Sequence, residues 1–392
     1  MGIDRVGNDL ASRVDPERLK DLALELVRIP SPPGQERAVA EAYAGYLSKI
    51  GLEVTLDEEY PDSPSVIARL KGTADRPILQ LDGHTDTIDL AGPIPRYEDG
   101  YLYGRGTEDM KAALAAMAEA ARVIIASGIR LGGGLLLTAH GRHESGTNET
   151  LASLLQKGIH GDAAIVAELG GHNLPIMGLG LAIFELRISR DGKIMHENIA
   201  PPGLPHPILA GARALQLLQE RAKDLAQHPL PYVGPETIFV GRFQSGDYFN
   251  RLPTTCILAG ARRFGPDRSM DDIRAEFDAL AQQVTLETGA HVEVDISGLE
   301  GFRVAEDERI VQVIRHAHQV VTGEQLPFVG TRTVANAPQF IRLANVPAVY
   351  YGTTYLTAHS DDERVELAEV VRAAKVYVHA ILGYLGIIGA VA

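Results

Sequence analysis

The stretch Ile-Leu-Gln-Leu-Asp-Gly-His-Thr-Asp-Thr, residues 78–87, is an apolar run that ends in a polar His-x-Asp loop. The apolar residues predict a buried strand, and the loop predicts a metal ligand at the end of that strand. In such a pair the imidazole of His84 binds the ion while the carboxylate of Asp86 fixes the tautomer of the ring. A histidine that merely satisfies a structural hydrogen bond is the alternative.

A second polar loop, Gly-Arg-Gly-Thr-Glu-Asp-Met-Lys at residues 104–111, opens an alanine-rich helical stretch. It contains Asp109, whose carboxylate can bridge to a second metal ion. Neither loop is specific alone. The two loops in this order favour a metal site over a structural coincidence.

Short apolar runs alternate with helical patterns in the first part of the chain. The expected elements are helices at 15–29 and 36–50, strands at 65–70, 78–81, 134–138 and 163–167, and helices at 110–126 and 150–157. This alternation predicts an α/β fold with a mostly parallel sheet flanked by helices. His84, His143, Glu144 and Glu168 each follow an expected strand, as ligand sites in open α/β sheets do.

The pattern changes near residue 178. Three expected strands (181–189, 255–261 and 291–296) and two expected helices (208–225 and 270–286) predict a smaller α+β domain with its own core. A helix at 307–321, a strand at 348–351 and a final helix from about 365 then resume the first pattern. We therefore expect a catalytic domain of residues 1–178 and 299–392 and an inserted domain of residues 179–298.

Composition narrows the class of protein. The chain has 392 residues, 45% of them hydrophobic and 22% charged, which is ordinary for a globular protein. Its net charge of -14 argues against a nucleic-acid partner, because binding phosphates needs clustered cations. The apolar run 377–392 is short and broken by glycines, so we expect a packed terminal helix and no membrane anchor. The single Cys256 and the absence of an apolar leader predict a cytoplasmic protein.

The motifs GHTDT, GRGTEDMK, HGRHESG, VAELG and AHSDDE follow one another along the chain. This ordered set is similar to that of the two-metal aminoacylase and carboxypeptidase family, which includes acetylornithine deacetylase, succinyl-diaminopimelate desuccinylase and glutamate carboxypeptidase. The resemblance covers nearly the whole chain. It implies one or two divalent ions per subunit, a lid and dimerisation role for residues 179–298, and a homodimer or higher homo-oligomer.

The resemblance also implies a role for each candidate ligand. His84 and Glu168 would bind the first ion and Glu144 and His359 the second, with Asp109 bridging both ions and Asp86 orienting His84. Two histidines and three carboxylates suit Zn²⁺, Mn²⁺ or Co²⁺. A shared aspartate can hold two such ions about 3.5–4 Å apart.

Three further residues match positions of the family that contact the substrate. They are His196 in Lys-Ile-Met-His-Glu, Asn250 in Asn-Arg-Leu-Pro and Arg263 in Ala-Arg-Arg-Phe. The resemblance implies that His196 reaches into the site of a partner subunit and donates to the developing oxyanion. Asn250 and Arg263 would hold a substrate carboxylate, which an arginine can grip with two hydrogen bonds. A surface histidine, a turn asparagine and an exposed arginine are the alternatives.

The chain departs from the family at two positions. His143 stands where the family has the glutamate that acts as general base, and Asn336 stands where it usually has aspartate. Both departures remove negative charge near the ions, so we expect at least one ion to bind weakly without substrate. His143 can be a replacement base, a substrate-binding or extra metal-binding group, or the relic of a lost activity.

The sequence thus predicts a metal-dependent hydrolase of a small carboxylate-bearing substrate. The expected reaction is cleavage of an amide C–N bond, with water on the metal ions as nucleophile and His143 as the base. Hydrolytic deamination of an amino-bearing acid is the enzymatic alternative. A binding paralogue that has lost turnover is the alternative from another class.

Overall fold

The computed structural model describes residues 2–146, 148–333 and 335–390, and the chain divides into two compact units. Unit 1 comprises Met1–Ile176, Val304–Phe328 and Ala335–Ala392. Unit 2 comprises Met177–Arg303 and Val329–Val334. The chain therefore leaves unit 1 after its first part to form unit 2.

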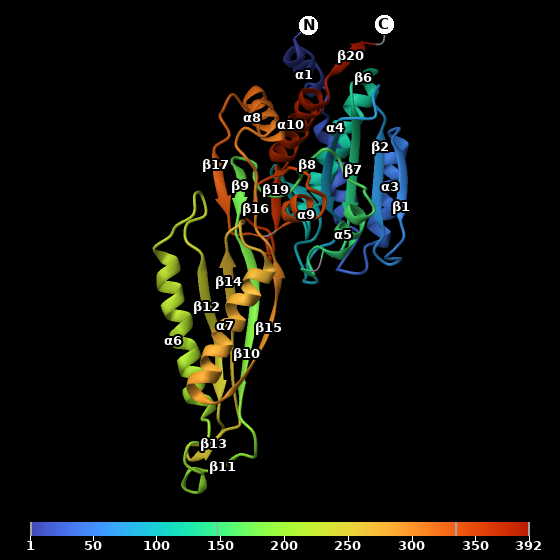
Figure 1. Cartoon of the computed structure of the whole chain (residues 1–392). Helices are drawn as coiled ribbons and strands as arrows, with labels where there is room; N and C mark the ends of the chain where they lie inside the picture. Colours follow the sequence, from blue (N-terminus) through green and yellow to red (C-terminus); the bar gives the residue numbers. More distant parts are fainter. Residues whose placement is uncertain (1, 147, 334, 391–392) are drawn as a thin grey trace. The chain divides into compact units, whose positions relative to one another are not determined.

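Unit 1 is built on a six-stranded sheet (Figure 1). In spatial order its strands are β1 (Glu53–Asp57), β2 (Ser65–Leu70), β7 (Gly134–His140), β3 (Ile78–His84), β8 (Ala163–Val166) and β18 (Ala348–Tyr350). The last four strands run parallel to one another, and β2 runs antiparallel to both of its neighbours, β1 and β7. The expected α/β fold with a mostly parallel sheet is confirmed.

Eight helices of unit 1 flank this sheet in the part of the chain that the structure describes. They are α1 (Ile3–Ala11), α2 (Pro16–Val27), α3 (Arg37–Lys49), α4 (Ala112–Ala126), α5 (Glu149–Gln156), α8 (Arg309–Thr322), α9 (Ala337–Ala344) and α10 (Leu367–Leu385). Helix α4 is almost entirely buried, and it packs against α2, α10 and β3. Its many alanines permit this close approach of neighbouring backbones.

The two faces of the main sheet differ in polarity. Residues Leu79 and Leu81 of β3 are fully buried on the face that packs against α4. On the other face Leu154 of α5 packs against Ile67 and Leu136. A row of buried polar side chains, Gln80, Asp82, Thr138 and His140, continues that face toward the carboxyl ends of the strands. Buried polar groups of this kind must be hydrogen-bonded to one another.

Short strands complete unit 1. One small sheet has the order β19 (Arg364–Glu366), β5 (Tyr101–Tyr103), β4 (Arg96–Glu98), and another pairs β20 (Ile387–Ala390) with β6 (Ile129–Leu131). The expectation of a helix through residues 377–392 is wrong at its end. Gly386, at a φ of 72°, terminates α10, and the chain continues as β20, while residues 391–392 lie outside the described part. None of the described helices could cross a membrane.

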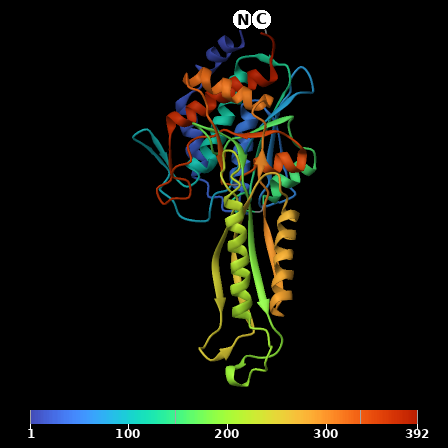
Figure 2. The ribbon, with the colours of Figure 1, turned by 60° about the vertical axis from the view of Figure 1, so that its left-hand side comes forward.

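Unit 2 is an antiparallel sheet with two helices packed along it (Figure 2). Its strands, in spatial order, are β12 (Thr237–Ser245), β14 (Thr255–Phe264), β10 (Gly180–Ser189) and β15 (His291–Leu299). Helices α6 (Pro207–Ala226) and α7 (Met270–Thr288) bury an apolar core against it. Strands β9 (Leu174–Gly178), β16 (Phe302–Arg303) and β17 (Phe328–Thr331) form a further small sheet, and β11 (Met195–His196) pairs with β13 (Arg251–Leu252).

Successive side chains of a strand point to opposite faces of the sheet. The face of the unit 2 sheet that is turned away from this core also carries apolar side chains. Ile183, Ala261 and Phe239 lie in register across three strands. Ile183 is 58% exposed and Phe239 is 68% exposed. Large apolar side chains placed side by side on a surface are typical of a protein–protein interface.

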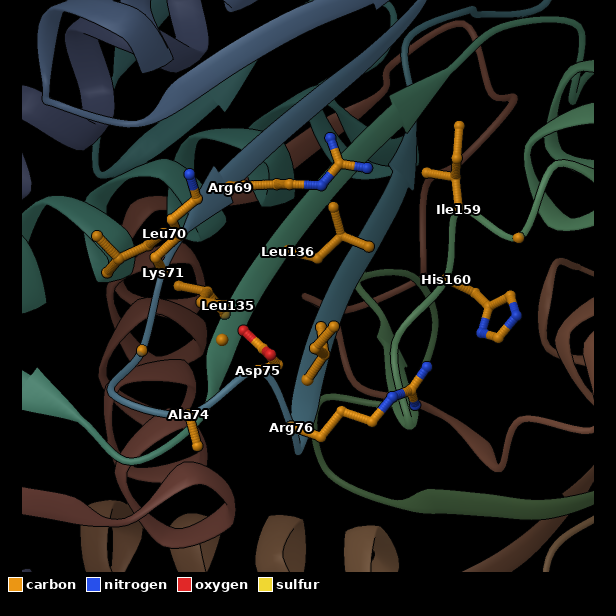
Figure 3. Close-up of a pocket in the computed structure, with 14 residues that line it drawn as sticks. Arg69, Leu70, Lys71, Ala74, Asp75, Arg76, Leu135, Leu136, Ile159 and His160 are labelled. Carbon is orange, nitrogen blue, oxygen red and sulfur yellow. The ribbon is translucent and has the colours of Figure 1, made fainter.

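A cavity of about 290 Å³ opens at the amino end of β3. Figure 3 shows Arg69 of β2 and Leu136 of β7 among its lining residues, together with Arg76 and His160 from the loops before β3 and β8. His84 lies at the carboxyl end of β3, six residues from Ile78 and roughly 20 Å away at 3.3 Å per residue. The cavity is therefore separate from the groups that follow the strands.

A buried histidine in unit 1 predicts a pH-dependent loss of stability. His318, 2% exposed, lies 2.8 Å from the hydroxyl of Tyr351, which also accepts from Arg372. Tyr351 thus donates to Nδ1 of a neutral ring. Burial and the charge of Arg372 lower the pKa of His318 from 6.5 to about 4. Because the unfolded state binds the extra proton, stability is present above pH 6.5 and is lost as the pH falls toward 4.

We predict that this linkage costs the wild type about 2 kcal/mol of unfolding free energy between pH 7 and pH 5. In His318→Asn the amide oxygen still accepts from Tyr351 but cannot titrate. Urea unfolding of both proteins at the two pH values measures the difference. Parallel pH dependence in the two proteins would show that His318 contributes nothing to it.

Candidate metal centre

His84 occupies the end of β3 and directs its two ring nitrogens to different partners. Nδ1 lies 3.0 Å from the backbone carbonyl oxygen of Asp86 and 3.5 Å from its carboxylate oxygen Oδ1. Nε2 lies 3.1 Å from Oδ1 of Asp109. The Nδ1–H donates to the Asp86 carbonyl, which leaves Nε2 as the atom that could bind an ion. The Asp86 carboxylate accepts from the backbone N–H of Glu144 at 2.8 Å.

Asp109 lies between two histidines. Its Oδ1 faces His84, and its Oδ2 is 3.1 Å from Nε2 of His359 and 2.9 Å from the hydroxyl of Tyr355. The same His359 nitrogen is 3.1 Å from Oε1 of Glu144. Each carboxylate oxygen of Asp109 thus belongs to a different cluster of potential ligands. This is the arrangement that a bridging carboxylate requires.

Glu168, just after β8, has a buried oxygen without a hydrogen-bond partner among the described residues. This atom is Oε2, while Oε1 lies 3.9 Å from Nε2 of His143. A buried carboxylate oxygen left unpaired is costly, and a bound cation would remove the cost. Two groups of described residues have ligand atoms within 4.8 Å of one another: His84, His143 and Glu168, and His84, Asp109 and Glu144. The residues present therefore fit one or two divalent ions.

The electrostatics of the cluster indicate the same need for positive charge. Burial and the charge of Asp109 raise the pKa of Glu144, and they raise the pKa of Glu168 well above its usual range. A hydrogen bond to Asp109 raises the pKa of His359 to about 9. Without ions, protons partly neutralise the carboxylates. Divalent cations would take over that role.

His143 and Asn336, the two departures from the family pattern, contact each other. Nδ1 of His143 lies 2.9 Å from Oδ1 of Asn336. The imidazole stacks on that of His84, with ring centroids 4.2 Å apart and planes inclined by 13°. Burial and the neighbouring charge of His84 lower the pKa of His143 to about 4. His143 is therefore neutral at pH 7 and can accept a proton.

Sequence reasoning missed Glu363, which braces the loop that carries Asp109. Its Oε1 accepts from the backbone N–H groups of Gly106, Glu108 and Asp109 at 3.0, 3.1 and 3.2 Å, and its Oε2 accepts from Arg105 at 2.7 Å. The signal was available, because Glu363 closes the AHSDDE motif. Tyr355, which donates to Asp109, was also missed, and it lies outside every motif that we quoted.

The three expected substrate-contacting residues lie in unit 2. Nδ2 of Asn250 is 2.9 Å from Nε2 of His196; His196 is exposed and Asn250 is half-buried. Arg263 lies near the far end of β14, where it donates to the backbone carbonyl of Arg332 at 2.8 Å. The structure therefore pairs His196 with Asn250 and places Arg263 apart from them within the unit.

Comparison with known proteins bears on these observations. The chain is 26% identical to N-formyl-4-amino-5-aminomethyl-2-methylpyrimidine deformylase of Bacillus subtilis, over 94% of this chain and 95% of the relative. It is also 26% identical to succinyl-diaminopimelate desuccinylase of Cereibacter sphaeroides, over 93% and 98%. The crystal structure of aminopeptidase PepT from Bacillus cereus has the same fold, with a TM-score of 0.81, 22% identity, and coverage of 95% and 99%.

A family match decides the class of protein. Residues 80–383 match peptidase family M20/M25/M40, and they include every candidate ligand described above. The resemblance inferred from the ordered motifs is confirmed. The chain belongs to peptidase family M20/M25/M40 and is a metal-dependent hydrolase that acts on C–N bonds.

Proposed function

We propose that the chain cleaves an amide bond in a small carboxylate-bearing substrate, such as an N-acyl amino acid or a dipeptide. The proposal rests mainly on the position of Asp109, because one of its carboxylate oxygens faces His84 and the other faces His359. The names of the two relatives, a deformylase and a desuccinylase, describe removal of an acyl group from a small molecule.

The proposed ligand sets are those that the family resemblance implies, and the contacts of Asp109 support them. His84, Asp109 and Glu168 would hold one ion, and Asp109, Glu144 and His359 the other. Bound Zn²⁺, Mn²⁺ or Co²⁺ ions would polarise the substrate carbonyl and lower the pKa of the attacking water. Asp86 supports both sets, because its backbone carbonyl orients His84 and its carboxylate holds the N–H of Glu144.

His143 supplies the proton transfer in this proposal. Its Nδ1 is engaged by Asn336, while its Nε2 lies on the side of Glu168 and is free to accept a proton from water. The ring could then return that proton to the leaving nitrogen as the C–N bond breaks. A positioned acid–base group of this kind contributes about 10²- to 10⁴-fold to the rate.

Unit 2 would supply substrate contacts and the subunit interface. Arg263 and Asn250 would bind the substrate carboxylate, and His196 of a partner subunit would donate to the oxyanion. The exposed Ile183 and Phe239, on either side of the half-buried Ala261, support a homodimer, because pairing of two copies would remove these side chains from water.

The test of the proposed function is turnover on a panel of N-acyl amino acids, dipeptides and amino-bearing acids, with released amine and ammonia scored separately. We expect amine release that EDTA abolishes and that Mn²⁺, Zn²⁺ or Co²⁺ restores. Ammonia released from an unacylated acid would instead establish a hydrolytic deaminase, the alternative that the replacement of the usual base by His143 favours. If no substrate of the panel is turned over, the result contradicts both amide cleavage and hydrolytic deamination and favours a binding paralogue.

His143→Ala tests the proposed base. We expect kcat to fall about 10²- to 10⁴-fold with little change in KM, since the lost group acts on the proton and not on substrate binding. His228→Ala, at an exposed histidine of unit 2, is the control. If kcat survives in His143→Ala, another group takes the proton. If His143→Glu raises amide cleavage above wild type, His143 serves a different reaction.

Glu363→Gln tests the support of Asp109. A Gln side chain has one oxygen where Glu363 has two, and its amide nitrogen would face either the three backbone N–H groups or Arg105. We expect metal affinity, measured by calorimetric titration of Mn²⁺ into metal-free protein, to fall about 10- to 100-fold. The control is Glu366→Gln, at an exposed side chain three residues further on. Equal Mn²⁺ affinities in the two variants would show that Glu363 does not support the metal site.

A further inference from the structure

A continuous series of hydrogen bonds, here called the line, runs from the loop before β8 to His143. Its members are Gly161, Gln80, Thr138, Asp82, Asn336 and His143. We propose that Asp82 and Asn336 are positioning residues that hold His143 in the tautomer with the proton on Nδ1. Nε2 then keeps its lone pair on the side of Glu168. The inference rests on the proposed function for its role in catalysis, but the tautomer itself follows from the hydrogen bonds.

The direction of the first half of the line, from Gly161 to Asp82, is set by a backbone group. The N–H of Gly161, the residue after the cavity-lining His160, can only donate, and it lies 2.9 Å from Oε1 of Gln80. The other end of the Gln80 amide is therefore its Nε2, 2.7 Å from the hydroxyl oxygen of Thr138. Since that nitrogen only donates, Thr138 accepts there and gives its own proton to Oδ1 of Asp82 at 2.6 Å.

In the second half of the line, the Asp82 carboxylate sets the direction of the bonds that lead to the imidazole. Oδ2 of Asp82, a carboxylate oxygen that only accepts, is 3.2 Å from Nδ2 of Asn336. The Asn336 amide must therefore present its oxygen to His143, whose Nδ1 is 2.9 Å away. An amide oxygen cannot donate, so the proton of this bond belongs to Nδ1. The second N–H of Asn336 points to Nε2 of His140 at 3.0 Å.

Burial makes the arrangement rigid. Gln80, Asp82, Thr138, His140 and Asn336 have no exposed surface. Water therefore cannot replace a member that turns the wrong way. The opposite tautomer of His143 would set a ring lone pair against the Asn336 oxygen and leave both buried atoms without a proton between them.

The line also explains why the two family departures occur together. A glutamate at position 143 has no N–H to give, and an aspartate at position 336 would set a second carboxylate against Asp82. The amide at position 336 donates to Asp82 and accepts from His143 at the same time, which an ionised carboxylate there could not do. The structure thus links His143 to Asn336 as one unit.

The test is ¹⁵N NMR of the metal-free protein with labelled histidine, with the His143 signals assigned by their loss in His143→Gln. We expect a protonated Nδ1 and an unprotonated Nε2 in the wild type. In Asp82→Asn an amide at position 82 can donate to the Asn336 oxygen, so Asn336 can turn over and His143 should shift toward the Nε2–H tautomer. In Asn336→Ala the two tautomers should become mixed.

Tyr43→Phe is the matched control, because it removes a buried hydrogen bond of 2.9 Å to the Leu114 carbonyl in the same unit without touching the line. Its His143 signals should equal those of the wild type. An Nε2–H tautomer in the wild type would overturn the proposal. His143 signals that stay unchanged in both Asp82→Asn and Asn336→Ala would overturn it as well.

Kinetics separate positioning from a merely structural role. With a substrate found in the panel, Asp82→Asn and Asn336→Ala should lower kcat at least 10-fold and leave KM within about 2-fold, while Tyr43→Phe changes neither. A loss confined to KM would contradict positioning of the base. If NMR shows the expected Nδ1–H tautomer of His143 but no amide of the panel is cleaved, the inference about the tautomer is supported and the proposed function is wrong.

Discussion

The carboxylate of Asp109, with an imidazole on each side, is the interaction on which the site depends. His84 comes from the end of a strand and His359 from a loop 275 residues later in the chain, and both converge on one residue. Such convergence of buried negative charge is unfavourable without a cation, as the raised pKa values of Glu144 and Glu168 indicate. The fold thus gathers candidate ligands whose negative charge bound cations would balance.

The parallel sheet makes this convergence possible. Strands β3, β7 and β8 end at the same edge, so the residues that follow them meet there although they are distant in sequence. The polar row on one face of the sheet adds a second constraint. It joins the middle of β3 to the groups beyond its end, so the carboxylate of Asp82 on β3 decides, through Asn336, which nitrogen of His143 is protonated.

Much of this could be predicted from the sequence, because the signals were local. Apolar runs bounded by glycine and proline predicted the strands, and the ordered motifs predicted the residues that the structure gathers around Asp109. The strand β20 escaped prediction because its pairing with β6 is a contact between segments more than 250 residues apart. Glu363 was missed although it lies in the AHSDDE motif, because the motif does not show that its carboxylate accepts from the backbone N–H groups of a loop distant in the sequence.

The contact between His143 and Asn336 shows most plainly what a linear pattern conceals. In the sequence they are two separate losses of negative charge, and each alone suggests a weakened site. In the structure they share a hydrogen bond, and Asp82 fixes the direction of that bond. Charge counting therefore describes the change incompletely. If His143 is the base that we propose, the exchange of two carboxylates for an imidazole and an amide also replaces a base that needs no tautomer with one that works in a single tautomer. In that proposal, the buried row of polar side chains serves to select the tautomer.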